Sequence, residues 1–189
     1  KINGNTQSGN DITSADGVQV DTQHTLNITL FDSNNNLAQN APVTLSANQS
    51  GASFESTSLT TNETGTATTT VTLPETVTTT RINVSAGGFN ASATGDASIN
   101  VTSVAADATA LQFASDSRSL PANQDDVGVT VEVVDTFDNI NTTVTDSVTL
   151  TSDDTAVFDF DGSESSNVNL GSGTAGFTVD VGASGTATL

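Results

Sequence analysis

The chain has 189 residues, with 22 acidic residues against three basic ones and a formal net charge of −19. Duplex nucleic acid and anionic membranes are bound through basic surfaces, so neither is an expected partner. Cysteine is absent, which excludes disulfide staples and thiolate metal sites. No run of residues approaches the ~20 apolar residues that a membrane span requires, so direct membrane insertion is not expected.

Short runs of alternating apolar and polar residues in the first half predict half-buried antiparallel strands. They lie at 25–30, 43–47, 67–73, 82–86 and 99–101. Segments rich in Asn, Ser and Gly separate them and predict turns, at 33–36, 48–51, 62–65 and 86–88. No window combines helical spacing with helix caps. The first half is therefore predicted to be all-β.

The second half has the same organisation. Strands are predicted at 127–133, 148–150 and 175–181, and Phe158 is the expected counterpart of Phe54 as a core residue. An aspartate followed four positions later by an asparagine ends an alternating strand in each half, at Asp32 and at Asp135. We expect both to be turns in which the aspartate side chain bonds the backbone.

A repeated motif divides the chain. Residues 65–71 read GTATTTV and residues 173–179 read GTAGFTV. This repeat predicts two tandem β-sandwich modules, 1–104 and 105–189. The second ends where strands of the first continue, so we expect it to be incomplete at its C-terminus, either truncated or completed by another strand. The junction at 103–109 lacks Gly and Pro, which favours a limited range of inter-module angles.

The order of short motifs is similar to a known domain. The second half runs SLPAN, alternating valines, DTFDN and VTLTS, and the first half contains TLNITLFDSNNN, APVTLSAN and TNETGTATTTV. This order resembles the bacterial Ig-like domain, group 1, of the intimin/invasin type. The resemblance implies two tandem immunoglobulin-like β-sandwiches at the cell surface, with no shared catalytic residues. Asn35 and Asp138 replace the usual Gly of the aspartate loop, and Asn123-Gln124 replaces the usual Asp-Gly.

Acidic clusters suggest two places for calcium, which is bound by six to eight oxygen ligands. One has the D-x-D-G rhythm of a calcium loop, and the other is at the junction of the two modules, where a bound ion would stiffen the array. The residues are Asp153, Asp154, Asp159, Asp161 and Glu164 in the first, and Asp107, Asp125 and Asp126 in the second. The alternative for the first is a solvated hairpin turn.

Seven Asn-x-Ser/Thr sequences are candidate glycosylation sites. They begin at Asn27, Asn48, Asn62, Asn83, Asn90, Asn100 and Asn141. His24 is the only histidine, and with no cysteine it cannot form a zinc site without several carboxylates. A Ser-His-Asp triad would have to use His24, and no G-x-S-x-G motif supports one. We therefore expect His24 to be a surface or strand-end residue and the protein not to be an enzyme.

The predicted function is structural. We expect a spacer or adhesive stalk of a larger extracellular protein, whose partners are neighbouring Ig-like modules. The first alternative is a subunit of a surface layer or extracellular filament, with lateral contacts between identical subunits that calcium could bridge. The second is a carbohydrate- or receptor-binding module. Calcium is the one cofactor that the composition suggests.

Overall fold

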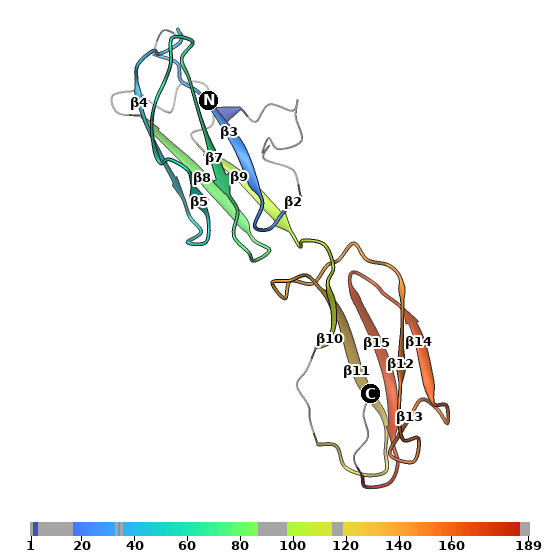
Figure 1. Cartoon of the computed structure of the whole chain (residues 1–189). Helices are drawn as coiled ribbons and strands as arrows, with labels where there is room; N and C mark the ends of the chain where they lie inside the picture. The colour runs from blue at the N-terminus through green and yellow to red at the C-terminus, as the bar shows by residue number, and fades with distance from the viewer. Residues whose placement is uncertain are drawn as a thin grey trace. The chain divides into compact units, whose positions relative to one another are not determined.

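The computed structural model describes residues 2–3, 17–32, 34, 36–86, 98–114 and 119–185 (Figure 1). In these ranges every regular element is a β-strand, which confirms the predicted all-β class. No helix in the described ranges is long and apolar enough to cross a membrane. The chain divides into two compact units, Lys1–Val104 and Ala105–Leu189, called unit 1 and unit 2 below.

Unit 1 consists of two sheets. The first has the order β1 (Ile2–Asn3), β3 (Gln23–Thr29), β7 (Thr66–Thr72) and β5 (Ser53–Phe54). The second has the order β2 (Val18–Gln19), β9 (Ser98–Val104), β8 (Thr79–Ala86), β4 (Pro42–Ala47) and β6 (Ser58–Thr60). All neighbours are antiparallel except β2 and β9, which are parallel.

The core of unit 1 lies between these sheets. Leu26 and Ile28 of β3 pack with Leu45 of β4, Ile82 of β8 and Val101 of β9 in one buried cluster. In β3 and β9 the residues between these apolar positions are less buried, so both strands show the two-residue period of a half-buried sheet. Phe54 packs against the cluster as a partly buried residue. Two sheets with a shared apolar layer make a β-sandwich.

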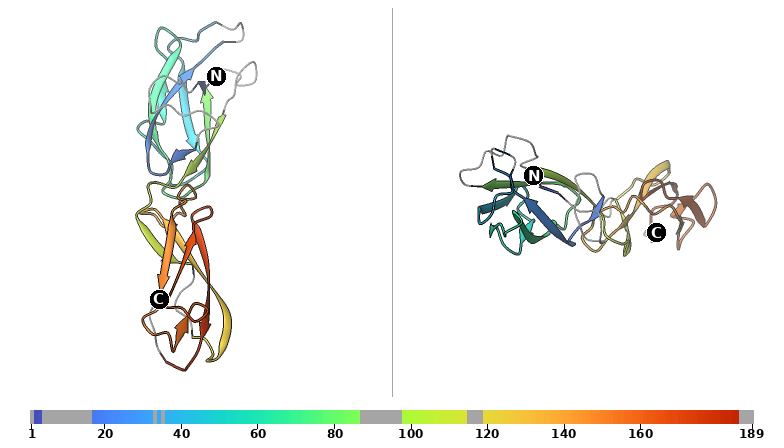
Figure 2. Two further views of the ribbon diagram at one scale, coloured as in Figure 1. Left: turned by 90° about the vertical axis from the view of Figure 1, so that its right-hand side faces the viewer. Right: turned by 90° about the horizontal axis from the view of Figure 1, so that it is seen from above.

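Unit 2 has a similar arrangement of strands. One sheet has the order β10 (Ala110–Phe113), β11 (Gln124–Val134), β15 (Thr174–Val181) and β13 (Phe158–Asp159), and the other contains β12 (Ser147–Thr151) and β14 (Ser165–Asn169). All of these neighbours are antiparallel, and a bulge lies between Gln124 and Val127 of β11. Val131, Leu150, Phe177 and Val179 belong to its core. Figure 2 shows the strands of both units from further directions.

Six strands of unit 1 have a counterpart in the described part of unit 2. The order β1-β3-β7-β5 corresponds to β10-β11-β15-β13, and β4-β6 corresponds to β12-β14. β4 and β12 even share the sequence Val-Thr-Leu, at 43–45 and 148–150. In the described part of unit 2, however, no strand corresponds to β2, β8 or β9. The sheet that contains β12 is therefore narrower than its counterpart in unit 1.

The glycine of the repeated motif has a structural reason. Gly65 and Gly173 have φ values of 67° and 78°, a conformation that residues with a Cβ rarely adopt. A Cβ on Gly65 would lie 2.9 Å from Cβ of Leu37, and one on Gly173 would lie 2.5 Å from the carbonyl oxygen of Asn141. The motif therefore marks the same tight turn before β7 and before β15.

Candidate functional site

Unit 1 has a self-bonded aspartate loop directly after β3. Oδ1 of Asp32 accepts hydrogen bonds from the backbone N–H groups of Asn34 and Asn36, each at 2.8 Å. Oδ2 accepts from Nδ2 of Asn36 at 3.2 Å. The backbone hydrogen bond from Asn36, and then the bond from its side chain, lower the pKa of Asp32. The carboxylate thus stabilises its own turn, as the sequence predicted.

Unit 2 has the same loop, but its aspartate is buried. Asp135 is 2% exposed. Its Oδ1 accepts from the backbone N–H groups of Phe137 at 2.8 Å and Asn139 at 2.9 Å. Oδ2 accepts from Nδ2 of Asn139 at 3.0 Å and, in addition, from the backbone N–H of Ala106 at 2.8 Å. The second loop therefore also holds a residue that lies far away in the sequence.

Both backbone polar groups of Ala106 are hydrogen-bonded to side chains of unit 2. Nδ2 of Asn141 donates to the Ala106 carbonyl at 2.8 Å, and Asn141 is itself buried. Oδ1 of Asn141 accepts from the backbone N–H and the hydroxyl of Thr143, at 3.0 and 2.6 Å. We call Ala106, Asp135 and Asn141 the entry clamp. It fixes the first residues of unit 2 to the loop that follows β11.

The entry clamp requires a charged carboxylate. Burial alone would raise the pKa of Asp135, because it removes water from the ionised form. The hydrogen bonds from Asn139, Ala106 and Phe137 outweigh that effect and hold the pKa below its usual value. Every one of these groups is a donor, so they favour the form of Asp135 that only accepts hydrogen bonds.

The acidic segment predicted as a calcium loop consists of turns. Oδ1 of Asp159 accepts from the backbone N–H of Gly162 at 2.6 Å. Asp161 and Gly162, with φ of 54° and 78°, form the tip of a tight hairpin. Oδ1 of Asp154 accepts from the backbone N–H of Ala156 at 2.9 Å. One carboxylate oxygen of Asp154 and one of Asp159 are thus engaged in turn hydrogen bonds.

The remaining predicted calcium ligands lie on exposed surface. They are Asp107 near the entry clamp, Asp125 and Asp126 at the bulge of β11, Asp153 after β12 and Glu164 before β14. The backbone N–H of Asp126 donates to Oδ1 of Asp180 at 2.8 Å. Within the described ranges, no group of three or more Asp, Glu, His or Cys residues is placed to hold a metal ion. Calcium binding is still a prediction.

The candidate glycosylation sites differ in solvent access. Asn48, Asn62 and Asn100 are exposed, Asn27 and Asn83 are half-buried, Asn141 is buried, and Asn90 lies outside the described residues. Nδ2 is the atom that would carry a glycan, and in Asn141 it is bonded to Ala106. Of the six candidates in the described ranges, three are therefore accessible, and a glycan on Asn141 would be incompatible with the entry clamp.

His24 lies at the start of β3. Its Nε2 is 2.6 Å from the hydroxyl oxygen of Thr22, whose own proton goes to the carbonyl of Gln19. The imidazole therefore takes part in a local polar contact that ties β3 to the preceding turn. This is the strand-end role that the sequence predicted.

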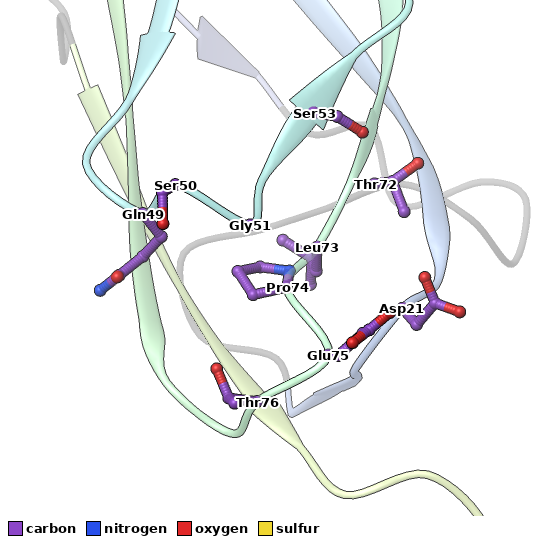
Figure 3. Close-up of a pocket in the computed structure, with 10 residues that line it drawn as sticks. All are labelled: Asp21, Gln49, Ser50, Gly51, Ser53, Thr72, Leu73, Pro74, Glu75 and Thr76. Carbon is purple, nitrogen blue, oxygen red and sulfur yellow. The ribbon is translucent and has the colours of Figure 1, made fainter. Parts of the chain in front are cut away.

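Unit 1 has an open depression of about 440 Å³ at one end, shown in Figure 3. Pro74 lies close to Gly51 there, and a Cβ on Gly51 would be 3.1 Å from Cβ of Pro74. Asp21 and Glu75 line one side, and Nε2 of Gln49 donates to the backbone of β8 at 3.2 Å. Its lining contains no aromatic side chain on which a sugar ring would stack. It offers little to a carbohydrate ligand.

No protein-family model and no curated protein matches the chain. Among solved structures, the chain is similar to the Escherichia coli adhesin FdeC, with a TM-score of 0.53, 17% identity and coverage of 89% of this chain and 54% of that chain. It also matches the Yersinia pseudotuberculosis adhesin InvE, with a TM-score of 0.44, 15% identity and coverage of 87% of this chain and 49% of that chain. A third match is the D0-D1 domain of intimin, with a TM-score of 0.38, 18% identity and coverage of 88% of this chain and 80% of that chain.

The likeness to FdeC concerns the fold. The chain spans about half the length of that adhesin structure, at an identity too low to carry function across. Together with the two-sheet units, it shows the bacterial Ig-like β-sandwich fold that the sequence motifs predicted.

Proposed function

We propose that the chain is a non-catalytic structural segment of an extracellular surface protein, a spacer or adhesive stalk built from tandem Ig-like sandwiches. The observation that carries this proposal is the repetition of one strand order in two compact units of a single chain. A module that buries its own core can be repeated to set length without any change in chemistry. Its partners are then the neighbouring modules of the same protein.

Three further observations support the proposal. A solved structure with a similar fold belongs to an adhesin. The acidic composition is compatible with an exposed extracellular surface and not with nucleic-acid binding. The polar side chains that sequence patterns suggested for chemistry, such as Asp135 and His24, are engaged in bonds that stabilise turns and strand ends.

The entry clamp gives this function a mechanical basis. A force on the chain between the two units reaches unit 2 at Ala105 and Ala106 and meets the bonds from Asp135 and Asn141 first. Bonds to a buried, charged carboxylate are stronger than those between neutral groups. The clamp therefore delays the transfer of force to β10, whose four residue pairs with β11 follow.

Solution state tests the proposal against the assembly alternative. We expect the chain to be monomeric by light scattering, with an elongated small-angle scattering profile, in calcium and in excess chelator alike. A calcium-bridged surface layer or filament would instead show ordered assembly that chelator dissolves. That result would overturn the stalk and assign function to lateral contacts between identical subunits.

Ligand binding tests the remaining alternative. A carbohydrate-binding module predicts specific signals on a glycan array, lost on substitution of Asp21 and Glu75 in the depression of unit 1. The stalk predicts no such signal. Glycan signals that the wild type gives and these variants lose would contradict a purely structural role.

A further inference from the structure

The middle of β15 has backbone groups that are unpaired on one side. Thr174, at the start of the strand, exchanges backbone hydrogen bonds with Gly171 on this side, and β13 pairs there with the last two residues of the strand. Because backbone groups alternate in direction along a strand, those of Gly176 and Thr178 point to the same side as those of Thr174. In residues 119–185, which the structure describes without a gap, neither residue has a backbone partner there. This edge can therefore accept another strand.

The described chain of unit 2 creates this opening itself. In unit 1 the segment after β5 covers the equivalent stretch, because the N–H of Glu55 donates to the Thr70 carbonyl at 3.0 Å. The repeated motif places Thr178 at the position of Thr70. In unit 2 the chain after β13 instead turns away, through the hairpin with Asp161 and Gly162 at its tip. The turn, and not a lack of chain, leaves the edge uncovered.

A depression of about 480 Å³ adjoins the open edge. Its apolar lining comes from Phe160, Phe177 and Val168, which belong to the core of unit 2 or pack against it. A Cβ on Gly176 would meet no atom within 4 Å, so there is space beside the strand at this position. Unpaired backbone groups thus lie next to a pocket for a side chain, which is the combination that binding by β-strand addition uses.

The depression is also acidic. Asp126, Asp161 and Asp180 line it, and the described part of unit 2 contains no lysine or arginine. Oδ1 of Asp180 accepts from the backbone N–H of Asp126 at 2.8 Å. In the described ranges these carboxylates do not form a group that could hold a metal ion. Their charge therefore favours a ligand with an ammonium or guanidinium group on a long side chain.

We propose that this edge binds an extended peptide segment of another protein, with a basic, a β-branched and an aromatic residue in that order. The segment runs antiparallel to β15, as β13 does, and exchanges backbone hydrogen bonds with Thr178 and Gly176. Its basic side chain lies opposite Thr178 and diagonal to Asp180 on the same face. Its β-branched side chain lies opposite Phe177 and enters the depression, and its aromatic side chain covers Gly176.

A second copy of the chain is a poor occupant. Arg81 is the only lysine or arginine among the described residues, and it lies in β8, which pairs with β4 on one side and β9 on the other. Two copies would also bring two acidic surfaces together, since the chain has 22 acidic residues against three basic ones. The partner is therefore a different protein, and its binding adds a lateral contact to the structural role proposed above.

Nuclear magnetic resonance of the full chain with a synthetic peptide tests the proposal. The peptide contains arginine, valine and phenylalanine in that order, flanked by serines and blocked at both ends. We expect it to shift the amide signals of Gly176, Phe177 and Thr178 and to protect the N–H groups of Gly176 and Thr178 from hydrogen exchange. Glutamate in place of the arginine should weaken binding about tenfold. N-methylation of the phenylalanine removes the N–H that bonds Gly176 and should abolish binding.

A matched pair of variants tests the charge. Asp161→Asn removes one carboxylate from the depression and keeps the turn, because asparagine adopts a positive φ readily. It should weaken binding of the arginine peptide about threefold. Asp138→Asn removes the same charge at another exposed residue with positive φ, outside the depression, and should leave peptide binding unchanged.

Four results would each overturn the proposal. They are no amide shifts at millimolar peptide, shifts that map to another part of the chain, equal binding of the glutamate or N-methylated peptide, and an equal loss of binding with Asp161→Asn and Asp138→Asn. None of these results bears on the stalk, which light scattering and small-angle scattering test.

Discussion

The two aspartate loops use one motif for different purposes. In each, a carboxylate after a strand bonds the backbone four positions on, as at Asp32 with Asn36 and at Asp135 with Asn139. Among the described residues, Asp32 bonds only within its own loop and is partly exposed. Asp135 also bonds Ala106 and is buried. The aspartate of unit 1 thus stabilises only its own turn, whereas the aspartate of unit 2 also binds the first residues of that unit.

The difference shows that a local motif fixes a turn but not its importance. Capping of its own loop by an exposed aspartate is a small stabilising effect in water. The same carboxylate in a buried position leaves several N–H groups without an acceptor when it is removed.

Asp135→Asn should destabilise unit 2 by about 3 kcal/mol, because the new amide places a donor against the N–H of Ala106 or Asn139. Asp32→Asn should have a much smaller effect, since water replaces the lost acceptor. Chemical denaturation, followed by signals assigned to each unit, measures both. Equal effects at the two positions would contradict the role of Ala106.

Unit 1 has a buried polar anchor of its own at Thr61, which is 1% exposed. Its hydroxyl donates to the Ala38 carbonyl at 2.6 Å and accepts from the Ala41 N–H at 3.0 Å. Thr61→Val should destabilise unit 1 by about 2 kcal/mol. Thr80, equally buried, has no partner for its hydroxyl in the described structure.

The matched control is therefore Thr80→Val, which should stabilise unit 1 by about 1 kcal/mol. Denaturant midpoints of the two variants should move in opposite directions at constant slope. A loss of stability in both would mean that threonine at Thr80 has a partner, such as a buried water, and would remove the contrast.

Acid should weaken unit 2 through the entry clamp. The pKa of Asp135 is lowered from 3.8 in the folded chain, so its charge stabilises the fold above that value. The contribution is lost as pH falls from 3.8 through the folded pKa, at up to about 1.4 kcal/mol per pH unit. Denaturation at a series of pH values should show this slope in the wild type and not in Asp135→Asn.

The pKa of Asp32 is also lowered, so its charge likewise stabilises unit 1 above pH 3.8, and this contribution is lost in acid. Because it is accessible to water and ions, its share of the pH dependence should shrink in high salt. A pH slope of unit 2 that vanishes in salt as well would contradict the buried clamp.

The smallest effect concerns the tip of the second aspartate loop. Asp138 has φ of 64°, a left-handed conformation that residues with a Cβ adopt with strain. Asp138→Gly should stabilise unit 2 by about 0.5 kcal/mol, since glycine adopts this conformation without strain. Gly173→Ala is the control with the opposite expected sign. It should destabilise unit 2, because the added Cβ would clash with the backbone of Asn141. A thermal melt of each variant measures both shifts.

The long strands could be predicted from the sequence because their inward residues alternate. β3, β7, β11 and β15 all contain the expected apolar period, and both aspartate turns were predicted from one residue type and its spacing. The turn glycines, Gly65 and Gly173, are also visible in the sequence, because each begins a copy of the repeated motif. In each case the information lies within a few neighbouring residues.

The sequence does not predict β10, β14 or the entry clamp. β14 is mostly polar and β10 has only four residues, so neither contains a long alternating run. The clamp joins Ala106 to residues 29 and 35 positions later, and no local pattern encodes such pairing. The sequence marks Asn141 only as a glycosylation candidate, because most of its neighbours are polar loop residues and give no sign that its side chain is buried.

Single-molecule force spectroscopy of the full chain distinguishes two separately folded sandwiches from one cooperative unit. We predict two unfolding events, whose contour lengths match about 104 and 85 residues. Asp135→Asn should lower the force of the shorter event and leave the longer one unchanged, whereas Asp32→Asn should change neither measurably. A single cooperative event, or an equal loss of force in both events with Asp135→Asn, would contradict a chain of two separate sandwiches with an anchored entry to the second.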